Sequence, residues 1–219
     1  MTLKALEEGG ATVHLAVATS GASGVDDCDC DPPTKQAKAA LREEEQRASC
    51  RLFGLPEERL RFLRLEEDAG GHPVIGAGNG TLIAAALAEA APDAVFLPHG
   101  NDTSLGHRRV YEMVRSATDA WARRPTGPGA SRTVLALLNR DPKTIAMRED
   151  VVWPYDGERA AWKGALLRCH ASQQRRNQRT RGRGFDERIL AMDHDTARRH
   201  RLAEPYAEAF ELESYGDFG

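Results

Sequence analysis

The chain of 219 residues is long enough for one medium-sized domain with a hydrophobic core of its own. Hydrophobic residues make up 41% of it, charged residues 29%, and the formal net charge is −3, so it has the composition of a globular protein without a global positive field for nucleic acid or an anionic membrane. No apolar run is long enough to span a membrane and the N-terminus has no export signal, so we expect a cytoplasmic protein.

Signals for helices and strands alternate through the first half of the chain. In chain order we expect the end of a helix in 2–10, a strand in 11–21, a loop over 22–33, a helix over 34–53, a short strand over 60–65, a glycine-rich loop over 70–80, a helix that ends at Pro92, and a strand over 93–98. Small residues alternate with valine and leucine in 11–21, which favours a strand that is largely covered on both faces.

The second half begins with an amphipathic helix that runs to about Arg124. After it we expect a Gly/Pro linker, a strand over 133–139, a further strand over 144–148 and a mostly helical remainder. Strands that alternate with helices predict a single α/β domain over 1–219 with a mainly parallel sheet. Ligands of such sheets bind outside the carboxyl ends of the strands, so the loops after Thr19, Leu65, Pro98 and Asn139 should gather on one side.

The segment "LPHGNDTSLGHRRVYEMV" (97–114) places two histidines and an aspartate where a strand delivers its C-terminal loop. A histidine just inside the following helix can direct a ring nitrogen at an ion, and Asp102 can cap that helix or orient a histidine. An ordinary capped turn explains the same residues, because a metal needs three or four ligands and one loop rarely supplies them. On spacing alone both interpretations stay open.

The same segment, extended to "PDAVFLPHGNDTSLGHRRVYEMV", resembles the second motif of the LmbE-like (PIG-L) deacetylases. Two further segments resemble that family in the same order, namely "LREEEQRASCRLFGLPEERLRFLRLEED" and "WKGALLRCHASQ". The resemblance implies a Rossmann-like fold and a zinc-dependent hydrolase that removes an N-acetyl group from a small amino-sugar conjugate, with N-acetylglucosamine as the typical sugar. It also implies a water activated by Zn²⁺ and deprotonated by a carboxylate, which attacks the amide carbonyl.

Site residues follow from the resemblance position by position. His107 falls on a metal-binding histidine of the family, and Asp102 becomes the catalytic residue that organises its loop. Arg42 and His170 correspond to candidate substrate-binding positions, and we place His99 with them. The expected partner is therefore a small molecule.

The chain also departs from the family pattern. It has no Ala-His-Pro-Asp-Asp-Glu motif, which in the family ends the first strand and supplies a metal histidine, a metal aspartate and the general base. Ser104 and Gly106 stand where the family has a histidine and an acid. We therefore expect an N-terminally incomplete domain without its first strand, with His107 as its only zinc ligand and little or no hydrolase activity.

Two other interpretations compete with an enzyme. A module of the same fold that binds a sugar or nucleotide without catalysis would explain the departures. The run "QQRRNQRTRGRG" (173–184) contains five arginines, but no aromatic residues interleave with them, so we expect a solvated helix end rather than a nucleic-acid site. The acidic segment with Cys28 and Cys30 is expected to be a solvated loop with reduced thiols. The sequence indicates no oligomeric state.

Overall fold

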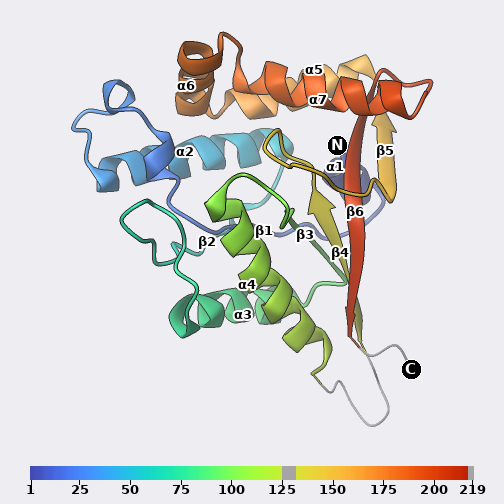
Figure 1. The fold of residues 1–219 in the computed structure, drawn as a ribbon, viewed down its shortest axis with the longest axis horizontal. Coiled ribbons are helices and arrows are strands. Elements are labelled where there is room, and N and C mark those ends of the chain that lie inside the picture. Colours follow the sequence, from blue (N-terminus) through green and yellow to red (C-terminus); the bar gives the residue numbers. More distant parts are fainter. Residues whose placement is uncertain (125–131, 217–219) are drawn as a thin grey trace. The chain divides into compact units, whose positions relative to one another are not determined.

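The computed structural model describes residues 1–124 and 132–216 (Figure 1). These residues form two compact units, the first made of Met1–Arg64 and Trp153–Glu208, the second of Leu65–Val152 and the segment from Ala209 onward. Helices flank strands in both units, which confirms the α/β class expected from the sequence. No helix in the described part is long and apolar enough to cross a membrane.

The first unit contains a short parallel strand pair and several helices. Its elements in chain order are α1 (Thr2–Glu8), β1 (Leu15–Val17), η1 (Ala22–Gly24), η2 (Asp27–Asp29), α2 (Lys35–Phe53), η3 (Glu57–Arg59), β2 (Leu60–Phe62), α5 (Gly157–Arg168), α6 (Ala171–Arg181) and α7 (Phe185–Arg199). Helix α2 begins where predicted, because Thr34 Oγ1 accepts the N–H of Ala37 at 3.1 Å. It ends at Gly54, whose left-handed φ of 91° favours glycine.

A buried ion network joins α5, α7 and the C-terminal segment of the first unit. Lys163 Nζ lies 2.6 Å from Asp193 Oδ2 and 2.5 Å from Glu208 Oε1, and all three side chains are at most 15% exposed. The Tyr155 hydroxyl donates to the same Asp193 oxygen. Burial alone would lower the pKa of Lys163, but the carboxylates of Glu208 and Asp193 raise it overall, so the ammonium stays charged.

The second unit holds a mixed sheet packed against two helices. Its elements are α3 (Ala77–Ala90), β3 (Ala94–Pro98), α4 (Leu105–Ala122) and β4 (Thr133–Asn139), and the sheet continues into β6 (Tyr206–Gly216) and β5 (Val151–Tyr155) in the order β3-β4-β6-β5. Strands β3 and β4 are parallel, whereas β4 and β6 are antiparallel. Helix α4 packs against β3 and β4 with α3 beside it (Figure 1). The core between them consists of Leu97, Ala122, Val134, Ala136, Leu138 and Tyr215.

The C-terminal part differs most from the sequence-based expectation. The remainder after 148 is expected to be mostly helical, yet 206–216 form β6, whose Ala207 and Ala209 side chains are buried. Alanine and glutamate favour helices, and here pairing with β4 overrides that propensity. The strand expected over 144–148 is wrong, because these residues are irregular and the strand is β5. The expected Gly/Pro linker after Arg124 falls largely outside the described residues.

Candidate metal centre

The loops that follow β3 and β4 lie side by side in the second unit. The two parallel strands end level with each other, so their loops begin at the same edge of the sheet. The N–H of Thr103 donates to the Lys143 carbonyl at 3.0 Å, and the N–H of Ile145 donates to the Asn101 carbonyl at 2.9 Å. These bonds confirm that the loops after Pro98 and Asn139 gather as expected.

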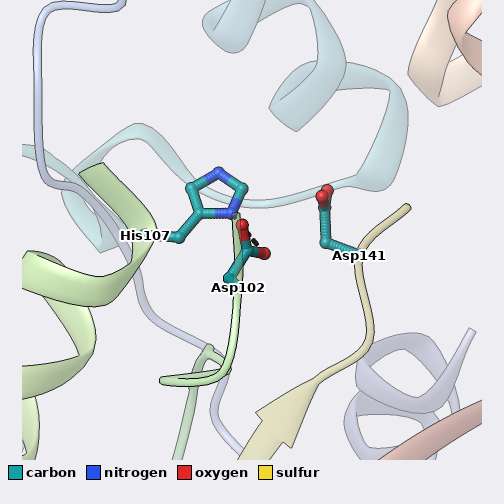
Figure 2. A group of neighbouring side chains, drawn as sticks. All are labelled: Asp102, His107 and Asp141. Carbon is teal, nitrogen blue, oxygen red and sulfur yellow. Dashed lines mark hydrogen bonds and ion pairs between the residues drawn. The ribbon is translucent and has the colours of Figure 1, made fainter. Parts of the chain in front are cut away.

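Three metal-ligating side chains meet where these loops join. Asp102 comes from the loop after β3, His107 from the first turn of α4, and Asp141 from the loop directly after β4 (Figure 2). One donor atom from each lies within 4.8 Å of the other two. Asp102 is fully buried, while His107 and Asp141 are partly exposed, so the group opens to solvent on one side. The sequence alone did not single out Asp141, whose signal is its position at the end of a predicted parallel strand.

Asp102 fixes the orientation of His107. Its Oδ1 accepts the N–H of Ser104 at 2.6 Å, and its Oδ2 lies 3.0 Å from His107 Nδ1. When Nδ1 carries the proton in this contact, the lone pair of Nε2 is left for a ligand. A carboxylate behind a metal-binding histidine commonly plays this part.

The chemistry of this donor set fits a divalent metal. An imidazole and two carboxylates are ligands that Zn²⁺ and related ions accept, and catalytic zinc sites use three protein ligands with one position open. Donors around a tetrahedral zinc lie roughly 3.4 Å apart, and the three donors here lie within 4.8 Å of one another. Two carboxylates stand beside His107, and the expectation that it is the only ligand stays a prediction.

His99 lies in the same loop but has both ring nitrogens occupied. Its Nδ1 accepts the N–H of Asn101 at 2.9 Å, its Nε2 lies 3.1 Å from Glu211 Oε2, and the residue is 7% exposed. The adjacent Gly100 is required by packing, since a Cβ there would lie 2.5 Å from the Tyr111 ring. These contacts make His99 a residue that shapes the turn, and its assignment to substrate binding stays a prediction.

Arg42 and His170 meet in the first unit. The guanidinium NH1 of Arg42 lies 3.4 Å from His170 Nδ1 and also contacts Glu45. Glu45 in turn accepts the Ser172 N–H at 2.6 Å and the Ser172 hydroxyl at 2.8 Å. Helix α5 ends at Arg168, and His170 immediately precedes α6. The assignment of Arg42 and His170 to substrate binding stays a prediction.

The half-buried imidazole of His170 is expected to make the protein sensitive to acid. Burial and the Arg42 guanidinium lower the pKa of His170 from 6.5 to about 4. The unfolded chain therefore binds more protons between these values, and the stability present above pH 6.5 is lost as the pH falls toward 4. Near pH 5 the loss should be about 2 kcal/mol. Urea unfolding near pH 7.5 and pH 5 should show this difference in the wild type and a smaller one in His170→Gln; equal pH dependence in both proteins would contradict it.

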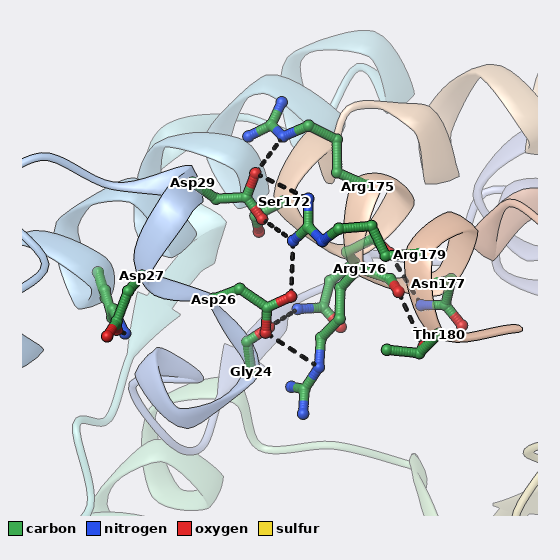
Figure 3. Close-up of polar contacts among 12 residues, drawn as sticks. Gly24, Asp26, Asp27, Asp29, Ser172, Arg175, Arg176, Asn177, Arg179 and Thr180 are labelled. Atoms are coloured by element: carbon green, nitrogen blue, oxygen red, sulfur yellow. Dashed lines mark hydrogen bonds and ion pairs between the residues drawn. The ribbon is translucent and has the colours of Figure 1, made fainter.

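The arginine run pairs with the acidic loop of the first unit (Figure 3). Arg175 Nε lies 2.6 Å from Asp29 Oδ1, and Arg179 contacts both Asp29 and Asp26, the latter at 2.6 Å. Arg176 lies 3.6 Å from Asp26 and donates to a backbone carbonyl of the loop. The expectation of a solvated helix end and a solvated loop is therefore incomplete, because the two segments neutralise each other. This pairing leaves little free charge on these three arginines for phosphates.

Solved structures share the fold of this chain over almost its whole length. The N,N'-diacetylchitobiose deacetylase from Pyrococcus horikoshii matches with a TM-score of 0.74 at 18% identity, covering 97% of this chain and 76% of that one. GalB, the 4-carboxy-2-hydroxymuconate hydratase from Pseudomonas putida KT2440, gives 0.69 at 17% identity, with 96% and 88% covered. The A40926 pseudoaglycone deacetylase Dbv21 gives 0.65 at 14% identity, with 97% and 89% covered. Identities this low establish the class of fold alone, and that class includes both deacetylases and a hydratase.

The family follows from the sequence. The family model described as PIG-L: GlcNAc-PI de-N-acetylase matches residues 1–118, more than half of the chain, and the chain belongs to this family. The resemblance to the LmbE-like deacetylases is thereby confirmed. The matched region contains Asp102 and His107, whereas Asp141 lies beyond it. A search of curated protein sequences gives no match.

Proposed function

We propose that this chain is a divalent-metal-dependent N-acyl hydrolase that removes an acetyl group from a small amino-sugar conjugate. The observation that carries the proposal is the meeting of Asp102, His107 and Asp141 at the carboxyl ends of two parallel strands. Membership of the PIG-L family and the fold shared with two deacetylases support the reaction type. Zinc is the expected ion, because imidazole and carboxylate are among its usual ligands.

Each of the three residues has a separate role in the proposed site. A bound divalent ion would polarise the acyl carbonyl and lower the pKa of water. His107 offers Nε2, held in place by the buried Asp102 carboxylate behind it. Asp141 Oδ1 accepts the N–H of Lys143 at 2.9 Å, and its second oxygen has no hydrogen bond within the described chain, so it is available as a ligand. The partly exposed side of the group leaves room for substrate.

A non-catalytic module that binds a sugar or nucleotide is the second candidate. Ser104 caps α4 and Gly106 lies in its first turn beside His107, and neither side chain is an acid or a base. A site without such groups in this turn can bind a polar ligand without cleaving it. Binding without turnover separates this candidate from the hydrolase.

Acetate release from a panel of N-acetyl amino sugars tests the proposal. The zinc-loaded protein should release acetate and free amine in equal amounts, and a chelator should stop the reaction. The exposed His14 lies in the other unit, so His14→Gln is a matched control that should keep the activity. Binding of N-acetylglucosamine without any acetate release would support the binding module instead.

A further inference from the structure

The loop after β2 folds into a short hairpin in the second unit. Asp68 N–H donates to the His72 carbonyl and Val74 N–H donates to the Glu66 carbonyl, both at 2.8 Å. The side chain of Asn79 braces the base of the hairpin, because it accepts from Glu66 N–H and donates to the carbonyls of Glu66 and Val74. The segment 66–74 is therefore a defined structure that can hold a side chain in place.

Arg109 ties this hairpin to α4. Its NH1 donates to Asp68 Oδ2 at 2.7 Å and to the Pro73 carbonyl at 3.2 Å. The other Asp68 oxygen accepts the backbone N–H groups of Gly70 and His72. The His72 N–H and the Arg109 guanidinium hold the pKa of Asp68 below its usual range, so the carboxylate stays ionised and the tie persists at neutral pH.

The tie brings the His72 imidazole to the first turn of α4. A Cβ built on Gly106 would lie 3.6 Å from His72 Nδ1 and 3.8 Å from Ser104 Oγ, and Gly106 immediately precedes His107. On the other side the ring lies against Gly70, where a Cβ would meet His72 Cδ2 at 3.2 Å. The ring is half-buried and forms no hydrogen bond with any described residue. The His72 imidazole, which has no hydrogen-bond partner among the described residues, thus lies beside the turn of α4 that contains His107.

Amide hydrolysis needs a proton donor that the three metal-ligating residues do not supply. Water adds its oxygen to the acyl carbon and gives a proton to a carboxylate or to solvent. The C–N bond then breaks with its electron pair on nitrogen, and this nitrogen must take up a proton to leave as an amine. In the proposed function His107 and Asp141 hold the ion, and Asp102 is paired with His107.

We propose that His72 is the general acid that protonates the leaving amine, which rests on the proposed function. Its imidazolium transfers a proton to the nitrogen as the C–N bond breaks, and the neutral ring takes a proton from solvent afterwards. Its position beside Gly106, which immediately precedes His107, places it next to the candidate centre, since a Cβ at Gly106 would be in van der Waals contact with the ring.

The test compares substrates with different leaving groups. His72→Gln should lower the rate on N-acetylglucosamine by about 10²-fold or more, because general acid catalysis contributes about 10²–10⁴-fold. The rate on 4-nitrophenyl acetate should change little, since nitrophenolate leaves without a proton. Zinc content should stay at the wild-type level because His72 is not among the donors, and the exposed-histidine control His14→Gln should keep both rates.

A second variant and the wild type distinguish a failure of the His72 proposal from a failure of the proposed hydrolase function. Arg109→Gln, which cuts the hairpin from α4, should give the same selective loss to a smaller degree. If His72→Gln lowers the rate on both substrates equally, or on neither, the role of His72 as general acid is overturned. Turnover of the wild type itself on N-acetylglucosamine decides the proposed function, so the two failures are distinguishable.

Discussion

Replacing His107 with alanine is expected to remove zinc binding and acetate release together. His107 is the one imidazole among the three donors, and its loss leaves two carboxylates, fewer than the three protein ligands that zinc sites use. The zinc affinity should fall by more than about 10²-fold, beyond the 10–100-fold typical of losing an outer partner of a ligand. Isothermal titration with zinc and the acetate assay measure the two effects.

Asp102→Asn provides a graded comparison for this prediction. The amide keeps the shape of the side chain and removes its charge, so it should weaken zinc binding less than His107→Ala does if Asp102 mainly orients His107. His14→Gln should leave zinc binding unchanged. Wild-type zinc affinity in His107→Ala would rule out this histidine as a ligand.

Replacing Lys163 with methionine is expected to cause the largest loss of stability. The substitution leaves Asp193 and Glu208 buried without their shared ammonium, and breaking a buried ion pair on one side costs about 3–5 kcal/mol. For a chain of this size the melting temperature should fall by about 6–20 °C. Thermal unfolding at neutral pH, followed by circular dichroism, measures the shift.

An exposed ion pair serves as the control for Lys163. Arg198 contacts Asp195 on α7 with 74% and 42% of the two side chains exposed, so Arg198→Gln should change the free energy of unfolding by less than about 1 kcal/mol. A loss in Lys163→Met as small as that in Arg198→Gln would show that the buried network contributes little.

Local signals explain which elements could be predicted from the sequence. Helix α2 is framed by a threonine cap and a terminal glycine, and β4 is an uninterrupted apolar run, so both were predicted nearly to the residue. Strand β6 depends on its pairing with β4, more than sixty residues earlier in the chain, and its alanines and glutamates suggest a helix when taken alone. Strand β6 was therefore missed because its conformation is set by pairing with a distant strand and not by its local sequence.

The same division applies to the candidate centre. Asp102 and His107 are five residues apart in one loop and helix start, so the sequence brings them together without a fold. Asp141 joins them only because β3 and β4 are parallel and in register, which no local pattern encodes. The approach of His72 likewise depends on a distant arginine, Arg109. Residues brought together by pairing between distant segments are the ones that sequence reasoning missed.

Zinc binding by the wild type and by Asp141→Asn tests the central claim most directly, since Asp141 is the donor that only the fold reveals. Elemental analysis after dialysis against dilute zinc should find about one equivalent in the wild type, in keeping with one site of three donors. Asp141→Asn keeps the size of the side chain and should retain much less than the wild type. An equal zinc content in both proteins, or none in the wild type, would contradict a metal centre built from Asp102, His107 and Asp141.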